Sequence, residues 1–185
     1  MTLRTNARVA GVTLIFYFAA GIASLVLSGR AHATDVLSMI TSFAALVLGV
    51  TLYAITREQD PDLAMLALTC RVIEAIPGNG LIYFAVGSTL FSWLLLRGRM
   101  IPAALAWLGV LGSVLLVVIL PLQRAGLFGG ARQGQPNLAE QDTPAVNWFS
   151  SVTWLMWFPL LVFELTLAVW LIVKGVAAPV QRQLA

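Results

Sequence analysis

The stretch LAMLALTCRVIEAIPGNGLIYFAVGSTLFSWLLL, residues 63–96, contains two apolar segments joined by a sequence that breaks helices. Residues 63–76 would span about 21 Å as a helix, less than the roughly 30 Å of a bilayer core. Pro77 disfavours helical geometry before it, and the two glycines that follow relax the backbone. The stretch therefore predicts a short hairpin, broken at Pro77–Gly80, which either crosses the membrane as two helices or enters and leaves it on one side.

The whole chain has the composition of a membrane protein. Of its 185 residues, 59% are apolar and 10% are charged, and the mean hydropathy is +0.90. These values lie outside the range of soluble domains. We therefore predict an all-α integral membrane protein, a single domain over residues 1–185 that forms a compact bundle of six transmembrane helices. The predicted spans are residues 9–27, 36–55, 63–76, 80–96, 101–122 and 146–173, and residues 123–145, which are rich in glycine and polar residues, form an external loop.

Basic residues at the ends of the spans indicate the orientation of the chain, because cytoplasmic loops are enriched in Lys and Arg. If the N-terminus is inside, seven basic residues lie on the inner side and three on the outer side. The inner set is Arg4, Arg8, Arg57, Arg97, Arg99, Lys174 and Arg182, and the outer set is Arg30, Arg124 and Arg132. We expect both termini in the cytoplasm.

Composition also excludes several functions. The net charge is +3, but the basic residues are scattered singly at segment ends, which argues against nucleic-acid binding. The single cysteine, Cys70, cannot form a disulfide or a thiolate metal cluster within one chain, and the single histidine, His32, cannot supply two-histidine haem ligation. No nucleophile has an adjacent base. We predict no cofactor, no metal site and no catalytic residue.

Three charged residues lie inside predicted spans, where charges are costly and are usually paired or functional. On a helix, Arg71 and Glu74 share a face with small residues, opposite bulky Met65 and Leu66, so this face should look into the bundle. If Leu63 and Lys174 mark one membrane boundary, Arg71, Glu164 and Glu74 lie about 12, 15 and 16 Å from it. We therefore expect Arg71 to pair with Glu164 across the bundle.

The break at residues 77–80 predicts a small polar recess that opens outward. Non-helical backbone at membrane depth must be buried in protein or wet. The candidate binding site consists of Arg71, Glu74, Glu164 and Asn79, with Arg71, Glu74 and Asn79 on the recess wall. In the alternative, the turn lies at the outer interface and Arg71 extends upward to it.

Stripes of small or polar residues mark the inward faces of other spans. Thr13, Tyr17, Ala20 and Ser24 form one stripe, and Ser38, Ser42, Ala45 and Gly49 form another. Such stripes are usually packing surfaces and less often a ligand path. Gly109, Gly112 and Ser113 offer a close-approach surface, which serves either packing within the chain or a homodimer.

Three stretches resemble a bacterial membrane family known as domain of unknown function 4386. They are ARVAGVTLIFYFAAGIA at residues 7–23, RVIEA at 71–75 and FAVGSTLFSWLLLRGRMIPAALAWLGVLGS at 84–113, so the resemblance covers most of residues 7–120. It implies a compact multi-helix membrane domain in the bacterial inner membrane, and it implies no particular activity or cofactor.

The leading functional hypothesis is a non-enzymatic membrane protein that binds a small amphipathic or ionic ligand in the recess, in transport or sensing. Its other partners are membrane lipids. One alternative is a membrane-embedded enzyme that uses a glutamate as general acid or base on a lipid-like substrate. The other is a structural subunit whose charges only hold helices together.

Overall fold

The structure is a computed structural model that describes residues 2–27, 30–76, 80–124 and 151–177. These residues form six helices and no strand, which confirms the all-α class. The helices are α1 (Leu3–Val26), α2 (Ala31–Thr56), α3 (Pro61–Glu74), α4 (Gly80–Arg97), α5 (Ala103–Arg124) and α6 (Ser151–Val173).

Five of these helices, all except α3, are long and apolar enough to cross a membrane. α3 has 14 residues and is shorter than a span, as its length of about 21 Å implies. α3 and α4 form the predicted hairpin, since α3 ends at Glu74 and α4 begins at Gly80. The predicted external loop, residues 123–145, lies almost wholly outside the described residues, as do Pro77 and Asn79.

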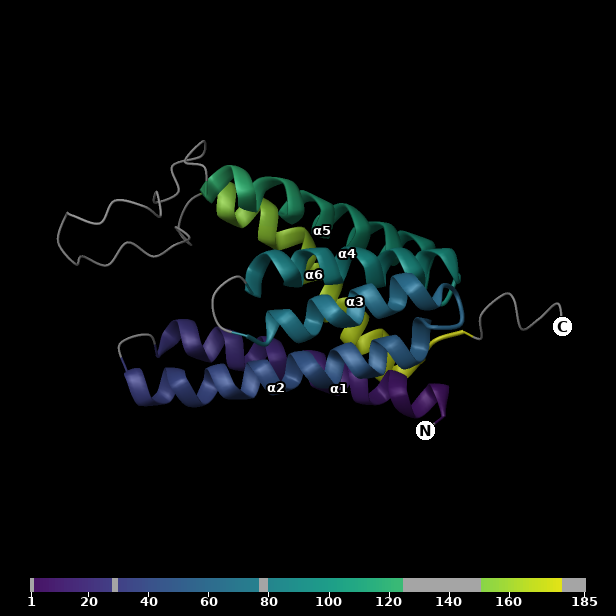
Figure 1. Cartoon of the computed structure of the whole chain (residues 1–185), viewed down its shortest axis with the longest axis horizontal. Helices are drawn as coiled ribbons and strands as arrows, with labels where there is room; N and C mark the ends of the chain where they lie inside the picture. The colour runs from purple at the N-terminus through teal and green to yellow at the C-terminus, as the bar shows by residue number, and fades with distance from the viewer. Residues whose placement is uncertain (1, 28–29, 77–79, 125–150, 178–185) are drawn as a thin grey trace, which may run out of the picture.

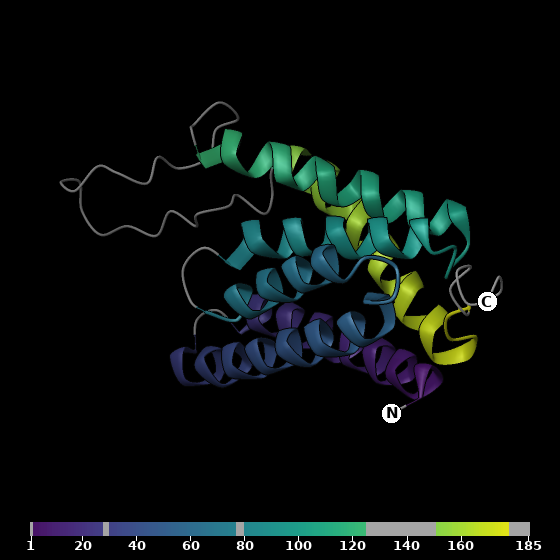
Figure 2. The ribbon, with the colours of Figure 1, turned by 45° about the vertical axis from the view of Figure 1, so that its right-hand side comes forward.

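The helices form a closed ring in chain order. Each helix packs against the next in sequence, and α1 packs against α6 to close the ring, while α2 also touches α4. Figures 1 and 2 show α1 and α2 side by side along one edge, with α5 at the opposite edge. In this order α3 and α6 lie opposite one another, so their inward side chains meet near the centre of the bundle.

We define the terminal end of the molecule as the end where α1 begins and α6 stops, at the right of Figure 1. α2 and α4 also finish at this end, and α3 and α5 start there. The opposite end therefore holds the starts of α2, α4 and α6.

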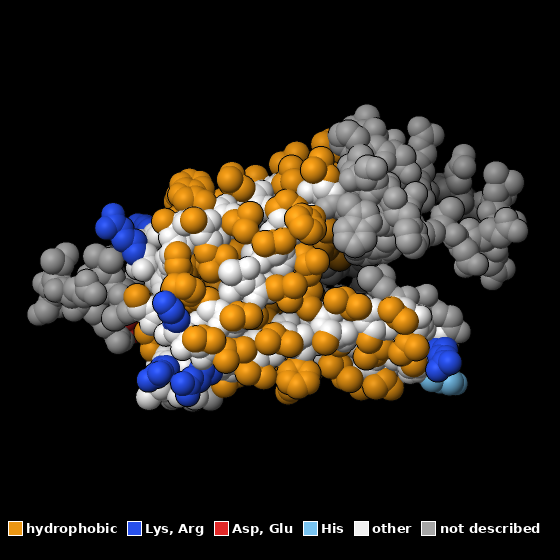
Figure 3. Space-filling view, turned by 180° about the vertical axis from the view of Figure 1, so that it is seen from behind, with side chains coloured by type: hydrophobic (Ala, Val, Ile, Leu, Met, Phe, Trp, Pro, Cys, Tyr) orange, Lys and Arg blue, Asp and Glu red, His pale blue; other side chains and the backbone are white. Residues whose placement is uncertain are grey.

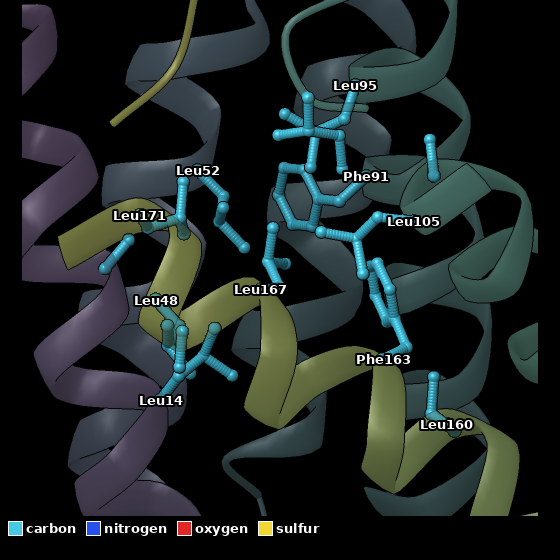
Figure 4. Close-up of a cluster of buried hydrophobic side chains, with 14 of the residues drawn as sticks. Leu14, Leu48, Leu52, Phe91, Leu95, Leu105, Leu160, Phe163, Leu167 and Leu171 are labelled. Carbon is cyan, nitrogen blue, oxygen red and sulfur yellow. The ribbon is translucent and has the colours of Figure 1, made fainter. Parts of the chain in front are cut away.

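Apolar side chains fill the ring between its centre and the terminal end, and the same cluster continues to Leu120 of α5 and Met156 of α6 toward the opposite end. Figure 4 shows Leu167 of α6 between Leu52 of α2 and Phe91 of α4, with Leu14 of α1 close by. All four side chains are buried, and they belong to one hydrophobic cluster. This half of the described ring is therefore packed mainly with apolar side chains.

The outer surface is suited to lipid. Large apolar side chains such as Phe16, Met39 and Phe43 are 63–73% exposed, and Figure 3 shows apolar side chains spread between the two ends. Basic side chains gather mainly at one end of this face, which is the terminal end. The described residues thus have an apolar belt with charged ends, as a bilayer requires.

Local sequence explains how α3 begins and how it fits between its neighbours. Asp60 caps the helix by accepting a hydrogen bond from the Leu63 amide at 3.1 Å, and Pro61 occupies the first turn. A Cβ atom added to Gly49 of α2 would lie 2.9 Å from Cβ of Arg71, and one added to Gly87 of α4 would lie 3.3 Å from Cβ of Cys70. Glycine at these two positions lets α3 approach both neighbours closely.

The predicted inward face of α3 is confirmed. Ala64, Ala67 and Arg71 are buried, whereas Met65 and Leu66 are half-exposed on the opposite face. Small residues accompany the arginine into the bundle because they leave room for its long side chain and for the neighbouring helices.

Candidate functional site

Arg71 lies at the centre of the ring and is 2% exposed. Its Nη1 donates a hydrogen bond to Oε2 of Glu74 at 2.9 Å, and its Nη2 donates to Oγ of Ser88 at 2.9 Å. The guanidinium is therefore held inside the bundle by side chains of α3 and α4. Buried carboxylates and a hydroxyl at hydrogen-bonding distance stabilise the guanidinium at this depth.

Glu164 reaches the same group from α6, across the ring. Its Oε1 lies 3.9 Å from Nη2 of Arg71 and accepts a hydrogen bond from Oγ of Ser88 at 3.1 Å. Ser88 therefore bridges the guanidinium and the second carboxylate. We refer to Arg71, Glu74, Ser88 and Glu164 as the buried cluster; it joins α3, α4 and α6.

Tyr17 extends the buried cluster to α1. Its hydroxyl donates a hydrogen bond to Oε1 of Glu74 at 2.6 Å, so Glu74 accepts one hydrogen bond on each carboxylate oxygen. The Tyr17 ring is parallel to the Phe84 ring at a centroid distance of 6.1 Å. The guanidinium carbon of Arg71 lies 4.9 Å from the centroid of Phe84, within the range of a cation–π contact.

A recess of about 240 Å³ opens beside the buried cluster, on the side away from the terminal end. It lies beside the last turn of α3 and the first turn of α4. The recess is lined by Tyr17, Ser38, Thr41, Ser42, Ala45, Glu74, Ala75, Ile76, Gly80, Leu81 and Phe84. Its wall thus combines one carboxylate, four hydroxyls and two aromatic rings with an apolar rim.

A second, much smaller cavity lies on the other side of the buried cluster, toward the terminal end. Its volume is about 10 Å³, close to the room that one water molecule needs. Arg71, Ser88, Ser92 and Glu164 supply its polar lining, and the remaining lining residues are leucines and phenylalanines. The buried cluster therefore lies between a large polar recess and a much smaller cavity whose other walls are apolar.

The structure brings three of the four predicted site residues together. Arg71, Glu74 and Glu164 meet at one depth, as helical rise predicts, and Glu74 lines the recess. Arg71 lies beneath the recess wall instead of on it. Asn79 lies outside the described residues.

Sequence reasoning did not assign two residues to this site. Ser88 bridges Arg71 and Glu164, and Tyr17 binds Glu74. Tyr17 and the recess residues Ser38 and Ser42 belong to the polar stripes noted above, so a signal existed for them. For Ser88 the only signal was a hydroxyl next to a glycine in an apolar helix, which is typical of a packing surface.

The charges of the buried cluster do not balance. One guanidinium faces two carboxylates, and no other Lys, Arg or His of the described residues lines either cavity. An uncompensated carboxylate is costly in a low dielectric. The arrangement therefore favours the uptake of one more positive charge. No group of three or more His, Cys, Asp or Glu side chains suited to a metal ion occurs among the described residues.

Comparisons with known proteins point to one family. The family described as domain of unknown function (DUF4386) matches residues 78–175, more than half of the chain, while no curated protein and no solved structure matches. The match contains Ser88 and Glu164 and begins after the RVIEA stretch, so it overlaps the resemblance found over residues 7–120 only in part. The chain therefore belongs to the DUF4386 family, and its five long apolar helices are those of an integral membrane protein.

Proposed function

We propose that this membrane protein binds a small amphipathic cation in the recess beside Glu74. The observation that carries the proposal is the position of the Glu74 carboxylate, on the wall of an open cavity within a cluster of one guanidinium and two carboxyl groups. Hydroxyls and aromatic rings on the same wall suit a ligand with both a charge and apolar groups.

The helix ends at the recess do not determine the sign of the charge that a ligand should carry. The C-terminus of α3 and the N-terminus of α4 both border it, and they carry partial charges of about half a unit and opposite sign. These two contributions offset one another. The full charge of Glu74 therefore sets the preference for a cation.

The proposal includes an orientation in the bacterial inner membrane. Six basic residues in the described part of the chain lie at or near the terminal end and two at the opposite end. The first set is Arg4, Arg8, Arg57, Arg97, Arg99 and Lys174, and the second is Arg30 and Arg124. This distribution supports cytoplasmic termini and a recess that opens to the exterior.

Choline is a suitable test ligand because its quaternary ammonium carries a fixed charge and needs no hydrogen bond. Both oxygens of Glu74 already accept hydrogen bonds, so a charge–charge and cation–π contact fits the wall better than a new donor. 3,3-Dimethyl-1-butanol has the same shape without the charge, and 3,3-dimethylbutanoate is an anion of similar size. These two compounds separate charge recognition from burial of apolar surface.

The experiment is equilibrium dialysis of labelled choline against the purified full-length protein in detergent at pH 8. We expect one saturable site, competition by neither analogue at equal concentration, and at least a tenfold loss of affinity in Glu74→Gln. Glu58→Gln is the matched control, because Glu58 is exposed at the end of α2 and does not line the recess. Absence of saturable choline binding, or equal affinity of the neutral analogue, would overturn the proposal.

A structural role is the second candidate. It is favoured by the hydrogen bonds of the buried cluster and Tyr17, which link four helices. Under this role, Glu74→Gln lowers the thermal stability in detergent and choline does not raise the stability of the wild-type protein. Under the binding role, saturating choline raises the melting temperature of the wild type and not that of Glu74→Gln.

A further inference from the structure

Arg71 is shared unequally between the two carboxylates. Its Nη1 lies 2.9 Å from Glu74, a direct hydrogen bond, whereas its Nη2 lies 3.9 Å from Glu164 and reaches it through Ser88. Glu74 also accepts a hydrogen bond from Tyr17 and borders the open recess. Of the two carboxylates, Glu74 therefore has the more direct contact with Arg71 and the larger number of hydrogen-bond donors.

Glu164 has the less favourable surroundings for a negative charge. The charged and titratable groups near it are Arg71 and Glu74 on α3 and Tyr17 on α1. α4 contributes the Ser88 and Ser92 hydroxyls, α2 contributes Leu52, and no described residue of α5 lines the cavity beside it. The nearest carboxylate repels its charge, and the cavity walls are otherwise apolar.

We infer that Glu164 holds a proton when the recess is empty and releases it when a cation binds beside Glu74, so that the protein exchanges a cation for a proton. This inference rests on the proposed function. In the empty state, protonated Glu164, ionised Glu74 and Arg71 sum to zero charge. In the occupied state, the bound cation and Arg71 balance two ionised carboxylates, and the sum is again zero. One O–H bond on Glu164 breaks, its proton leaves to water, and no other group changes charge.

The geometry supplies a simple coupling between the two sites. A bound cation competes with Arg71 for the charge of Glu74. A shift of the guanidinium by roughly 1 Å toward α6 would then bring Nη2 from its separation of 3.9 Å to the length of a direct charge-assisted hydrogen bond with Glu164. Ser88 lies between the two groups and can accompany this shift, since it contacts both. The partly open small cavity beside Glu164, whose volume is close to the room that one water molecule needs, provides the route by which the proton leaves.

Because a proton is released when choline binds, the direction in which choline affinity changes with pH can be predicted. Because the occupied state binds one proton fewer, raising the pH favours it. Choline affinity should therefore rise by up to tenfold per pH unit in the range where Glu164 changes its protonation on binding. Choline has no titratable proton at these pH values, so the dependence belongs to the protein.

The test measures choline binding and proton release together, in weakly buffered detergent solution with a pH indicator. For the wild-type protein we expect close to one proton released per choline bound. Glu164→Gln imitates the protonated carboxyl, so it should keep the low-pH affinity of the wild type at every pH and release no proton. Glu58→Gln should behave like the wild type in both measurements.

The outcomes separate this inference from the proposed function. If the wild type binds no choline, the proposed function fails. If the wild type binds choline with no proton release and a flat pH dependence, the exchange is overturned and the binding site stands. Proton release that persists in Glu164→Gln would also overturn the proposed exchange of a cation for a proton. The wild-type proton count decides the question even if the variant does not fold.

Discussion

Arg71 contacts two carboxylates, one hydroxyl and one aromatic ring, and each contact comes from a different turn or helix of the bundle. Sequence reasoning could predict its inward orientation, because small residues share its face, and its depth, because helical rise is constant. It could not predict Ser88, since an uncharged hydroxyl in an apolar helix carries no sign of which partner it has. Side chains that bridge helices depend on the order of helices around the ring, which local patterns do not encode.

Replacing Arg71 tests whether the residues of the buried cluster stabilise the fold together. Arg71→Ala removes the guanidinium beside Glu74 and Glu164, and we expect a loss of about 3–5 kcal/mol in unfolding free energy. Arg71→Ala combined with Glu164→Gln should recover part of this loss, with a coupling of about 0.5–3 kcal/mol. The measurement is reversible denaturation in detergent, or thermal stability where unfolding is irreversible.

The exposed ion pair between Arg97 and Asp60 provides the control for this experiment. Its N–O distance of 3.2 Å is short, but the side chain of Arg97 is 55% exposed. Exposed pairs are weak because water and salt screen them, so Arg97→Ala should cost no more than about 1 kcal/mol. Strictly additive losses in the Arg71 and Glu164 double variant would contradict the description of these residues as one cluster.

At the scale of the helices, hydropathy located the spans but not all of their limits. α1 and α2 begin at Leu3 and Ala31, several residues before the predicted starts at 9 and 36, because helical hydrogen bonds continue through polar residues that hydropathy assigns to a loop. α3 follows its sequence more closely, since Asp60 and Pro61 mark its start and the break at Pro77 limits its end. Residues at the end of α3 also line the recess.

Gly109 and Gly112 of α5 lie at the contact between α5 and α6. A Cβ atom added to Gly109 would lie 2.4 Å from the Phe163 ring, and one added to Gly112 would lie 3.2 Å from the backbone nitrogen of Leu160. In the structure these glycines face α6 of the same chain. Phe163 and Glu164 both line the small cavity, so this packing lies next to the buried cluster.

Gly109→Leu should therefore destabilise the protein, by about 1–3 kcal/mol, because the new side chain overlaps Phe163. Gly21→Leu is the matched control, since a Cβ atom at Gly21 of α1 meets nothing within 4 Å and leucine favours the helix. Thermal unfolding in detergent measures both. Unchanged stability of Gly109→Leu, together with the loss of a dimer in size-exclusion chromatography, would instead assign this surface to a homodimer.

At the scale of the whole molecule, the sequence predicted the number of helices but not the closure of the ring. Contact between α1 and α6 joins segments more than a hundred residues apart, and no short pattern indicates it. This closure is what lets Tyr17 of α1 and Glu164 of α6 reach one centre. The predicted orientation depends on charge counts alone, so it needs its own test.

Reporter fusions can test the orientation. A fusion at the C-terminus should report the cytoplasm, and one inserted in residues 126–142 should report the exterior, because six basic residues of the described chain lie toward the terminal end and only two at the other. An alkaline phosphatase reporter, active outside, and a fluorescent protein, active inside, give complementary readings. If both fusions report the same side, α6 does not cross the membrane between the two fusion sites, and the predicted topology is wrong.

We expect the recess to be accessible from only one side of the membrane. The charged reagent trimethylammonium-ethyl methanethiosulfonate does not cross membranes, and the single cysteine, Cys70, is buried and can be replaced by alanine. In this background, Ser42→Cys on the recess wall should react from the side opposite the termini, and choline should slow the reaction. Ser92→Cys should not react from either side, since Ser92 is 1% exposed and lies beyond the buried cluster.

Intact spheroplasts and inverted vesicles present the two faces of the membrane separately, so the same variants can be labelled from each. The apolar core between the buried cluster and the terminal end leaves the reagent no polar path, and labelling of Ser42→Cys should be confined to spheroplasts. Reaction in inverted vesicles would mean that the recess opens to the cytoplasm, or that the bundle also adopts a state in which its apolar half opens. Fusion data on the same membranes distinguish these two cases, because only the first requires the orientation to be reversed.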